Sequence, residues 1–304
     1  MPTKLTVLGT SAALPAKNRN LSAHLLEING HSLLFDCGEG TQFQLRKFKK
    51  KINNISSIFI SHFHGDHFFG MPGLISSMHM LDRRKELNVY LPEGFEEIAS
   101  AVFNLSRTEF KFPVKFHTIK VSNKTKILET EMYSVYAFPL QHRIETYGYL
   151  FEKNKSPLNI KKEFVKSQNI PIEWYRRIKK GEDYIDANGD IFLNKDITEP
   201  EKEIVSYAYC SDTKYFDGLA KWVKGASLLY HESTFLNELE EDAYAKQHST
   251  AKQAAMIAKK AGVKQLLLGH YSSRYNDINE FSKEAKVHFD NVLLGKEGME
   301  INLD

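Results

Sequence analysis

The chain has 304 residues, of which 42% are hydrophobic, so it is long enough to bury one large core or two small ones. This composition excludes an intrinsically disordered chain, and no run of about eighteen apolar residues is present to form a transmembrane helix. The net charge of +3 does not by itself indicate an anionic partner, because a solvated surface produces such a value without one.

The first residues of the chain and its two cysteines indicate the cellular compartment in which the protein is expected. The segment MPTKLTVLGTSAALP contains a short strand-like stretch, whereas a secretory signal has a longer apolar region followed by a cleavage site. We therefore expect a cytoplasmic protein. Its two cysteines, Cys37 and Cys210, could form only one bridge, so we expect free thiols.

The first half of the chain alternates apolar strands with helices, which is typical of the α/β class. Helices are expected at 40–48 and 74–84. Strands are expected at 4–9, 23–28, 32–38, 56–62, 88–92, 115–120, 126–130, 133–142 and 147–153.

A break in this pattern follows at 154–200, which is polar and lysine-rich with few periodic apolar positions. The segment is either a disordered linker or a functional insertion in a single domain that spans 1–304. Beyond it, strands are expected at 204–213, 226–234 and 264–270. Between the last two, 249–262 has a helical pattern with Ser249 or Thr250 as N-cap and Gly262 as its end.

The segment SHFHGDH carries the strongest chemical signal. It places His62, His64, Asp66 and His67 within six residues, at the end of a strand expected to be buried. Imidazole and carboxylate groups are the ligands of catalytic zinc, which usually takes three protein ligands and leaves one position open. Four ligands exceed the need of one such ion, so the sequence predicts two.

Further ligands must then come from elsewhere in the chain. A histidine or aspartate recurs where an expected strand stops or a helix begins. Each of these could individually be a surface side chain, but their recurrence at strand ends predicts one shared site. The candidates are His142, Asp212, His231, His248 and His270.

SHFHGDH looks like the signature of the metallo-β-lactamase superfamily, and several further motifs resemble those of the ribonuclease Z family of tRNA 3′-end processing endonucleases. PAKNRN resembles the PxKxRN loop, DCGEGTQ and CSDT resemble two further segments, and HESTF resembles the HEAT motif with Ser233 in place of alanine. HST and LLLGHYSSRY complete the set in the same order. The resemblance implies a metallo-β-lactamase αββα sandwich with a protruding basic arm at about 154–200.

The resemblance also implies how the ligands are shared. It places one zinc ion on His62, His64 and His142, a second on Asp66, His67 and His270, and Asp212 between them. Manganese or iron could replace zinc in the cell.

Two catalytic functions are implied by the same resemblance. Asp66 would be the general base. His248 and Glu232 would form the pair that donates a proton to the leaving group. Asp36 could orient a metal-bound histidine, as carboxylates commonly do.

Substrate contacts are implied for the PxKxRN loop and for the arm. The arm departs from the family pattern, because Ile172, Glu173, Trp174 and Tyr175 replace its Gly-Pro step, although basic and aromatic residues still suit RNA. A family arm of this kind serves the active site of the other subunit, so a homodimer is implied. The expected substrate-binding residues are Lys17, Arg19, Asn20, Trp174, Arg176, Arg177, Lys179 and Lys180.

The resulting prediction is an endoribonuclease that removes 3′ trailers from precursor tRNA, leaving a 3′ hydroxyl on the tRNA and a 5′ phosphate on the trailer. One alternative is a small-molecule phosphodiesterase or other hydrolase of the same superfamily, which would need neither the arm nor the PAKNRN loop. Another is a non-catalytic RNA-binding protein with a structural metal site.

Overall fold

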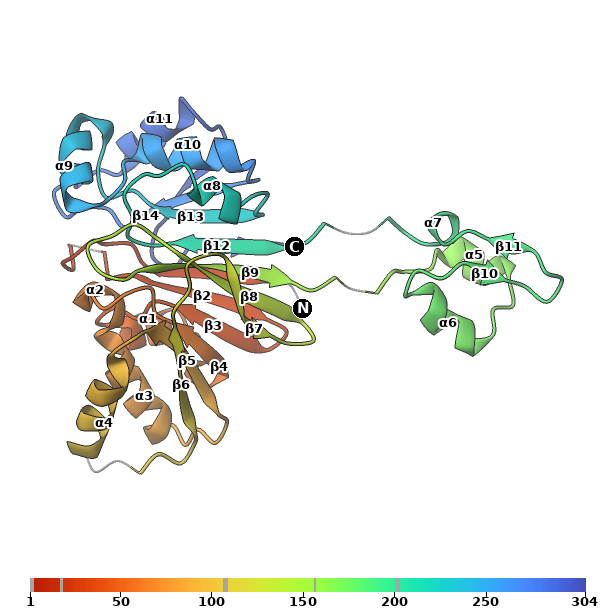
Figure 1. Cartoon of the computed structure of the whole chain (residues 1–304). Helices are drawn as coiled ribbons and strands as arrows, with labels where there is room; N and C mark the ends of the chain where they lie inside the picture. Colours follow the sequence, from red (N-terminus) through yellow and green to blue (C-terminus); the bar gives the residue numbers. More distant parts are fainter. Residues whose placement is uncertain (1–2, 17–18, 106–108, 156, 201–202) are drawn as a thin grey trace. The chain divides into compact units, whose positions relative to one another are not determined.

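The computed structural model describes residues 3–16, 19–105, 109–155, 157–200 and 203–304. It divides the chain into two units. The larger unit consists of Met1–Glu152 and Val205–Asp304, and the smaller one is Lys153–Ile204, which we call the arm. Figure 1 shows the elements of both.

The first sheet of the larger unit has seven strands. The strands from β3 to β6 run parallel to one another, whereas β16, β1, β2 and β3 pair in antiparallel fashion. Their order across the sheet is β16 (Glu300–Asn302), β1 (Lys4–Gly9), β2 (Ala23–Ile28), β3 (His31–Phe35), β4 (Ile55–Phe59), β5 (Leu87–Pro92) and β6 (Val114–Ile119).

The second sheet also has seven strands. Its strands β12 to β15 are parallel, and β9 pairs with β12 in antiparallel fashion. Their order is β15 (Val292–Leu294), β14 (Leu266–Gly269), β13 (Leu228–Glu232), β12 (Ser206–Cys210), β9 (Tyr147–Lys153), β8 (Tyr133–Pro139) and β7 (Thr125–Glu129).

The two sheets pack against each other through fully buried side chains such as Phe35 and Phe59 from the first sheet and Tyr149 and Tyr207 from the second. Apolar helix faces cover both outer surfaces, which gives four layers (Figure 1). The predicted αββα sandwich is therefore confirmed. No helix in the described ranges is long and apolar enough to cross a membrane.

The helices fall into one set for each sheet. The first set is α1 (Thr41–Lys47), α2 (Gly65–Phe68), α3 (Gly70–Met80) and α4 (Phe95–Leu105), with the 3-10 turn η1 (Ile52–Asn54). The second set is α8 (Leu219–Trp222), α9 (Glu240–Lys246), α10 (Ala251–Ala261) and α11 (Asn279–Lys286), with η2 (Asn237–Leu239).

Helix α10 has the ends that its sequence predicts. The Thr250 hydroxyl accepts the backbone N–H of Gln253, and the Gln253 side chain accepts the backbone N–H of Thr250. This capping box satisfies two donors that the first turn leaves unpaired. Gly262 ends the helix in the left-handed conformation, with φ of 61°.

The arm contains short elements packed around its own core. Ile160, Ile170, Ile178, Tyr184 and Ile197 are buried there, so a disordered linker does not describe this segment. The elements are α5 (Lys162–Ser167), α6 (Ile172–Ile178), β10 (Tyr184–Ile185), β11 (Ile191–Phe192) and α7 (Asn194–Ile197).

The chain leaves the larger unit for the arm after β9 and returns to it before β12. These two strands are antiparallel neighbours in the second sheet, with Ser206 opposite Glu152. Since the two attachment points lie at adjacent strand ends, the larger sheet is continuous without the arm.

We expect Ile178→Ala to unfold the arm and to leave the larger unit intact. Ile178 is fully buried in the arm core, and loss of such a side chain costs about 2–5 kcal/mol, which a core of this size cannot absorb. Limited proteolysis should cut selectively within 153–204, while calorimetry should find the main unfolding transition unchanged. Ile185→Ala is the matched control, because that side chain is 46% exposed. A single transition lowered for the whole chain would contradict the expectation.

Candidate metal centre

The polar side chains of the site follow strands of both sheets. His62 lies after β4 of the first sheet, whereas His142, Asp212 and His270 follow β8, β12 and β14 of the second. The structure brings these strand ends together at one edge of the sandwich, where they form groups suited to holding a metal ion.

The first group contains three imidazoles. His64 Nδ1 lies 3.1 Å from His62 Nε2 and 3.3 Å from His142 Nε2. The Nδ1 of His142 lies 2.9 Å from the backbone carbonyl of Gln247 and donates to it, so its Nε2 presents a lone pair to the group. Asp212 adds Oδ2 at 3.5 Å from His62 Nε2 and 3.7 Å from His142 Nε2.

The second group contains Asp66, His67 and His270. Asp66 Oδ2 lies 3.3 Å from His67 Nε2 and 3.4 Å from His270 Nε2. Asp212 Oδ1 approaches the same two nitrogens, at 3.4 and 3.2 Å. The two oxygens of Asp212 therefore face different groups, which is the geometry of a bridging carboxylate.

The residues of the site fit a divalent cation. His67 Nε2 and Asp212 Oδ1 are buried and make no hydrogen bond within the described part of the chain, and such atoms are costly unless an ion or a donor satisfies them. Burial lowers the pKa of His67, but the charges of Asp66, Asp212 and Asp36 raise it well above its usual value. A divalent cation would balance the same excess of negative charge in place of that proton.

Asp36 holds His67 from behind. Its Oδ2 lies 2.7 Å from His67 Nδ1 and accepts the Tyr209 hydroxyl at 2.7 Å, while its Oδ1 accepts the Ser61 backbone N–H at 2.7 Å. Asp36 and His270 both adopt left-handed backbone conformations, with φ of 55° and 59°. Such strain in residues other than glycine persists only where the surroundings enforce it, and both residues belong to this site.

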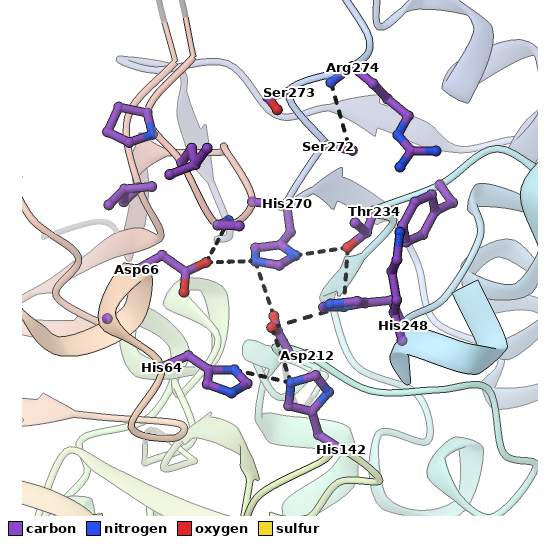
Figure 2. A pocket seen from close by; sticks show the side chains of 18 of the residues that line it. His64, Asp66, His142, Asp212, Thr234, His248, His270, Ser272, Ser273 and Arg274 are labelled. Carbon is purple, nitrogen blue, oxygen red and sulfur yellow. Dashed lines mark hydrogen bonds and ion pairs between the residues drawn. The ribbon is translucent and has the colours of Figure 1, made fainter. Parts of the chain in front are cut away.

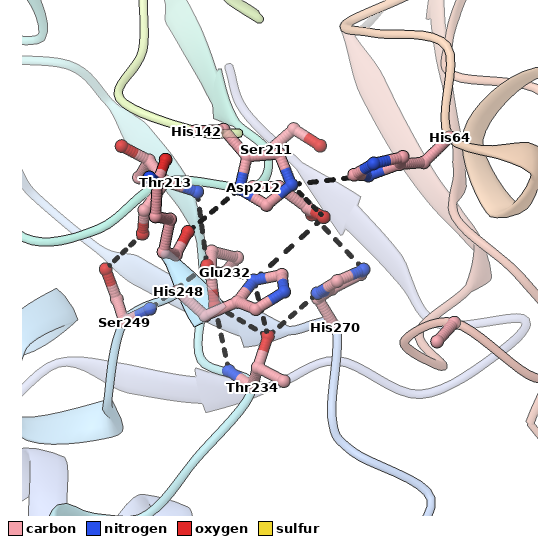
Figure 3. A network of polar contacts seen from close by, with 12 residues as sticks. His64, His142, Ser211, Asp212, Thr213, Glu232, Thr234, His248, Ser249 and His270 are labelled. Carbon is pink, nitrogen blue, oxygen red and sulfur yellow. Dashed lines mark hydrogen bonds and ion pairs between the residues drawn. The ribbon is translucent and has the colours of Figure 1, made fainter. Parts of the chain in front are cut away.

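Glu232 and His248 form a hydrogen-bonded pair at the wall of the site (Figure 3). Glu232 Oε1 lies 2.8 Å from His248 Nδ1, and the carboxylate also accepts the backbone N–H groups of Thr213, Ser249 and Thr234 at 2.9–3.2 Å. Glu232 is fully buried and does not line the pocket, so it acts on a bound molecule only through His248.

The charge state of His248 follows from its neighbours. Burial lowers its pKa, but the carboxylates of Glu232 and Asp212 raise it to about 9. These two carboxylates therefore favour the protonated form of the ring. Because Nδ1 is engaged by Glu232, Nε2 is the atom left to donate.

A pocket of about 640 Å³ lies over both groups, with Asp66, His142, Asp212, His248 and His270 among the residues that line it (Figure 2).

The pocket wall also carries cations beside an aromatic ring. The Phe235 ring lies 5.3 Å from Lys246 Nζ and 5.0 Å from the Arg274 guanidinium, and all three side chains line the pocket. Positive charge at this wall suits an anionic substrate.

The N-terminal loop expected to bind substrate contributes Pro15 and Leu21 to the lining of this pocket. Lys17 is outside the described residues. Arg19 donates to the backbone carbonyl of Ser272 at 3.2 Å, and neither Arg19 nor Asn20 lines the pocket. Their contact with a substrate remains a prediction.

The expected substrate-binding residues of the arm fall into two kinds. The Trp174 ring packs edge-on against the Tyr184 ring, with 5.2 Å between the ring centres. The Arg177 guanidinium lies 3.9 Å from the centre of the Trp174 ring. Both of these side chains are therefore engaged within the arm. The others, Arg176, Lys179 and Lys180, are exposed.

One of the five strand-end candidates does not join these groups, and two residues that contact them were not among the expected site residues. His231 is buried with Nδ1 2.7 Å from the Glu232 carbonyl and belongs to none of the metal-binding groups. Thr234, whose Oγ1 lies 2.9 Å from His270 Nδ1, was recognisable only by its place in HESTF. Ala13 donates its backbone N–H to Asp66 Oδ2 at 2.8 Å, and no side-chain pattern signals such a contact.

The four-layer sandwich and its histidine and aspartate groups at the strand ends define a metal-dependent hydrolase of the metallo-β-lactamase superfamily. Similar curated proteins are the ribonuclease Z of Parabacteroides distasonis, 37% identical over 98% of both chains, and that of Cytophaga hutchinsonii, 41% identical over 98% of this chain and 95% of the relative. The chain belongs to the ribonuclease Z family.

Solved structures and a family model give further comparisons. Human tRNase Z, short form, is 28% identical over 99% of both chains with a TM-score of 0.74. The metallo-β-lactamase fold protein YhfI of Bacillus subtilis is 20% identical over 99% of both, with a TM-score of 0.70, and shares the fold. Residues 3–158 match the family model of Anti-Pycsar protein Apyc1, which includes SHFHGDH and His142 but ends before Asp212.

We expect Asp212→Ala to lower the number of divalent metal ions that each chain retains. Asp212 presents one oxygen to each group, so its removal takes a ligand and a negative charge from both. Atomic absorption after dialysis against zinc measures the effect. Asp217→Ala is the control, because that carboxylate is 64% exposed and pairs with Lys260. Unchanged zinc content in Asp212→Ala would show that the carboxylate does not bridge.

Proposed function

We propose that this chain is a zinc-dependent endoribonuclease that cleaves 3′ trailers from precursor tRNA, leaving a 3′ hydroxyl on the tRNA and a 5′ phosphate on the trailer. The observation that carries the proposal is one pocket that combines the histidine and aspartate groups with the hydrogen-bonded pair of His248 and Glu232 at its wall. The ribonuclease Z name of its relatives and the tRNase Z name of a structural neighbour support the substrate. Precursor tRNA as substrate also implies a cytoplasmic location.

The metal ligands in this proposal are the two groups described above, with Asp212 shared. Bound zinc would supply a nucleophile at neutral pH, because it lowers the pKa of a bound water to about 7, and would offset charge on the phosphate. Manganese or iron would accept the same donors.

Asp66 would be the general base. Burial raises its pKa, but the charge of His67 and a hydrogen bond from His270 lower it below its usual value, so the carboxylate is ionised and can accept a hydrogen bond from a bound water. The Ala13 N–H fixes the position of Oδ2 at 2.8 Å.

His248 would protonate the leaving 3′ oxygen. Figure 2 shows Asp66 and His248 on opposite sides of Asp212 and His270. In-line displacement at phosphorus requires the attacking and leaving oxygens on opposite sides, so this placement suits a base at one end and an acid at the other.

The arm would bind the tRNA outside the active site. Arg176, Lys179 and Lys180 are exposed cations that can contact backbone phosphates, as can the loop with Lys17, Arg19 and Asn20. We further propose a homodimer in which each arm serves the active site of the other subunit.

A small-molecule phosphodiesterase is the second candidate. Residues 3–158, which match the family model of Anti-Pycsar protein Apyc1, include SHFHGDH and His142 but little of the arm, which a small-molecule substrate would not need. Both candidates use the same metal groups, so the arm separates them.

The central test is incubation of the pure protein with a 3′-extended tRNA transcript, with and without a chelator. We expect one cut at the trailer junction, with a 3′ hydroxyl on the tRNA product, and complete loss of cleavage after chelation that added zinc restores. The absence of product, or cleavage that resists the chelator, would exclude the proposal.

A variant without the arm separates the two candidates. Because Glu152 and Ser206 are opposite each other, an Asn-Gly turn can replace 154–204 and join β9 directly to β12. We expect loss of tRNA cleavage with retained turnover of bis(p-nitrophenyl) phosphate. Equal retention of both activities would favour the small-molecule candidate.

We expect His248→Ala to slow tRNA cleavage about 10²–10⁴-fold, which is the usual contribution of a general acid. Turnover of bis(p-nitrophenyl) phosphate should change little, because nitrophenolate leaves without a proton. Single-turnover rates on both substrates measure the difference, and His79→Ala in α3 is the control. Equal loss on both substrates would rule out the acid function of His248.

A further inference from the structure

The hydroxyl of Thr234 lies between the metal groups and the proton-donating pair. Its Oγ1 is 2.8 Å from Glu232 Oε2 and 2.9 Å from His270 Nδ1 (Figure 3), with His248 Nδ1 farther away at 3.3 Å. Thr234 is 4% exposed, so water does not compete freely for these contacts.

The direction of these hydrogen bonds follows from counting protons. Three backbone N–H groups donate hydrogen bonds to the Glu232 carboxylate, which is the environment of an ionised carboxylate. An ionised carboxylate can only accept hydrogen bonds. The single hydroxyl proton of Thr234 must then point to Glu232. Its lone pairs remain free to accept, and His270 Nδ1 supplies the N–H.

This hydrogen bond determines which ring nitrogen of His270 carries no proton. With the proton on Nδ1, the lone pair lies on Nε2, which is 3.2 Å from Asp212 Oδ1 and 3.4 Å from Asp66 Oδ2. Two other histidines of the groups also have Nδ1 engaged by an oxygen: that of His67 by Asp36 and that of His142 by the Gln247 carbonyl. For His270, Thr234 is the acceptor that the described residues provide.

We propose that Thr234 is a positioning residue that holds His270 in its metal-binding tautomer and joins it, through one hydroxyl, to the carboxylate that orients His248. The backbone of His270 is left-handed, with φ of 59°. The contact of its Nδ1 with Thr234 would fix the orientation of the ring. The inference rests on the proposed function only in taking zinc as the ion.

The test replaces Thr234 with valine, which keeps the shape and the backbone N–H but removes the hydroxyl. Zinc retained per chain is measured on the zinc-loaded protein during titration with a chelator. We expect the affinity of the group that contains His270 to fall about 10–100-fold, with the three-histidine group unchanged. At intermediate chelator concentrations, the Thr234→Val protein should retain one zinc ion per chain, whereas the wild-type protein should retain two.

Matched variants separate the hydroxyl from the fold. Thr234→Ser should restore both zinc affinities. Ser233→Ala removes the neighbouring hydroxyl, which donates to the Gly269 carbonyl at 3.1 Å, and should leave them unchanged. Thr234→Ala provides a second hydroxyl deletion if valine prevents folding. On precursor tRNA, kcat should fall in Thr234→Val while KM stays the same.

Wild-type zinc affinities in both hydroxyl deletions would overturn the inference, and so would an equal loss in Ser233→Ala. If the wild-type protein binds zinc but does not cleave precursor tRNA, the proposed function would be excluded instead. The zinc titrations would in that case still decide the assignment of Thr234.

Discussion

The buried carboxylate of Asp36 is the interaction on which the site depends. Asp36 follows β3 of the first sheet and accepts hydrogen bonds from Ser61, after β4, from Tyr209 in β12 of the second sheet, and from His67. All four residues are fully buried. An unpaired carboxylate in such a place would cost several kcal/mol, so this one group fixes the two sheets and His67 together.

The same principle applies throughout the site. Four of the imidazoles described here have one ring nitrogen engaged by an oxygen: His67 by Asp36, His142 by the Gln247 carbonyl, His270 by Thr234 and His248 by Glu232. These contacts decide which nitrogen faces the pocket. The chemistry of the site is therefore a property of the packed protein as much as of the ligands themselves.

The sequence predicted the parts of this structure that local patterns determine. Four residues of SHFHGDH are close in the chain, and α10 shows its ends through a capping threonine and a terminal glycine. The arm core was not predictable from periodicity, because its buried isoleucines are spread over short helices and two-residue strands. The contact of Ala13 with Asp66 uses a backbone N–H, which every residue except proline carries.

Residues from distant parts of the chain had to be assigned by motif and by their place at strand ends. His142, Asp212 and His270 are separated from SHFHGDH by whole strands, and only the order of the sheets brings them together. His231 satisfied the same strand-end pattern, but its ring bonds to the backbone beside it. Strand position therefore indicates which edge a residue occupies, and side-chain direction must come from the structure.

The spread of the ligands along the chain also orders the events of biosynthesis. Synthesis proceeds from the N-terminus, so the segment from His62 to His67 emerges long before His270. The second group of ligands is incomplete until β14 has joined its sheet and the two sheets have packed. A nascent or truncated chain that lacks this strand cannot assemble the second group, so both groups are complete only in finished molecules.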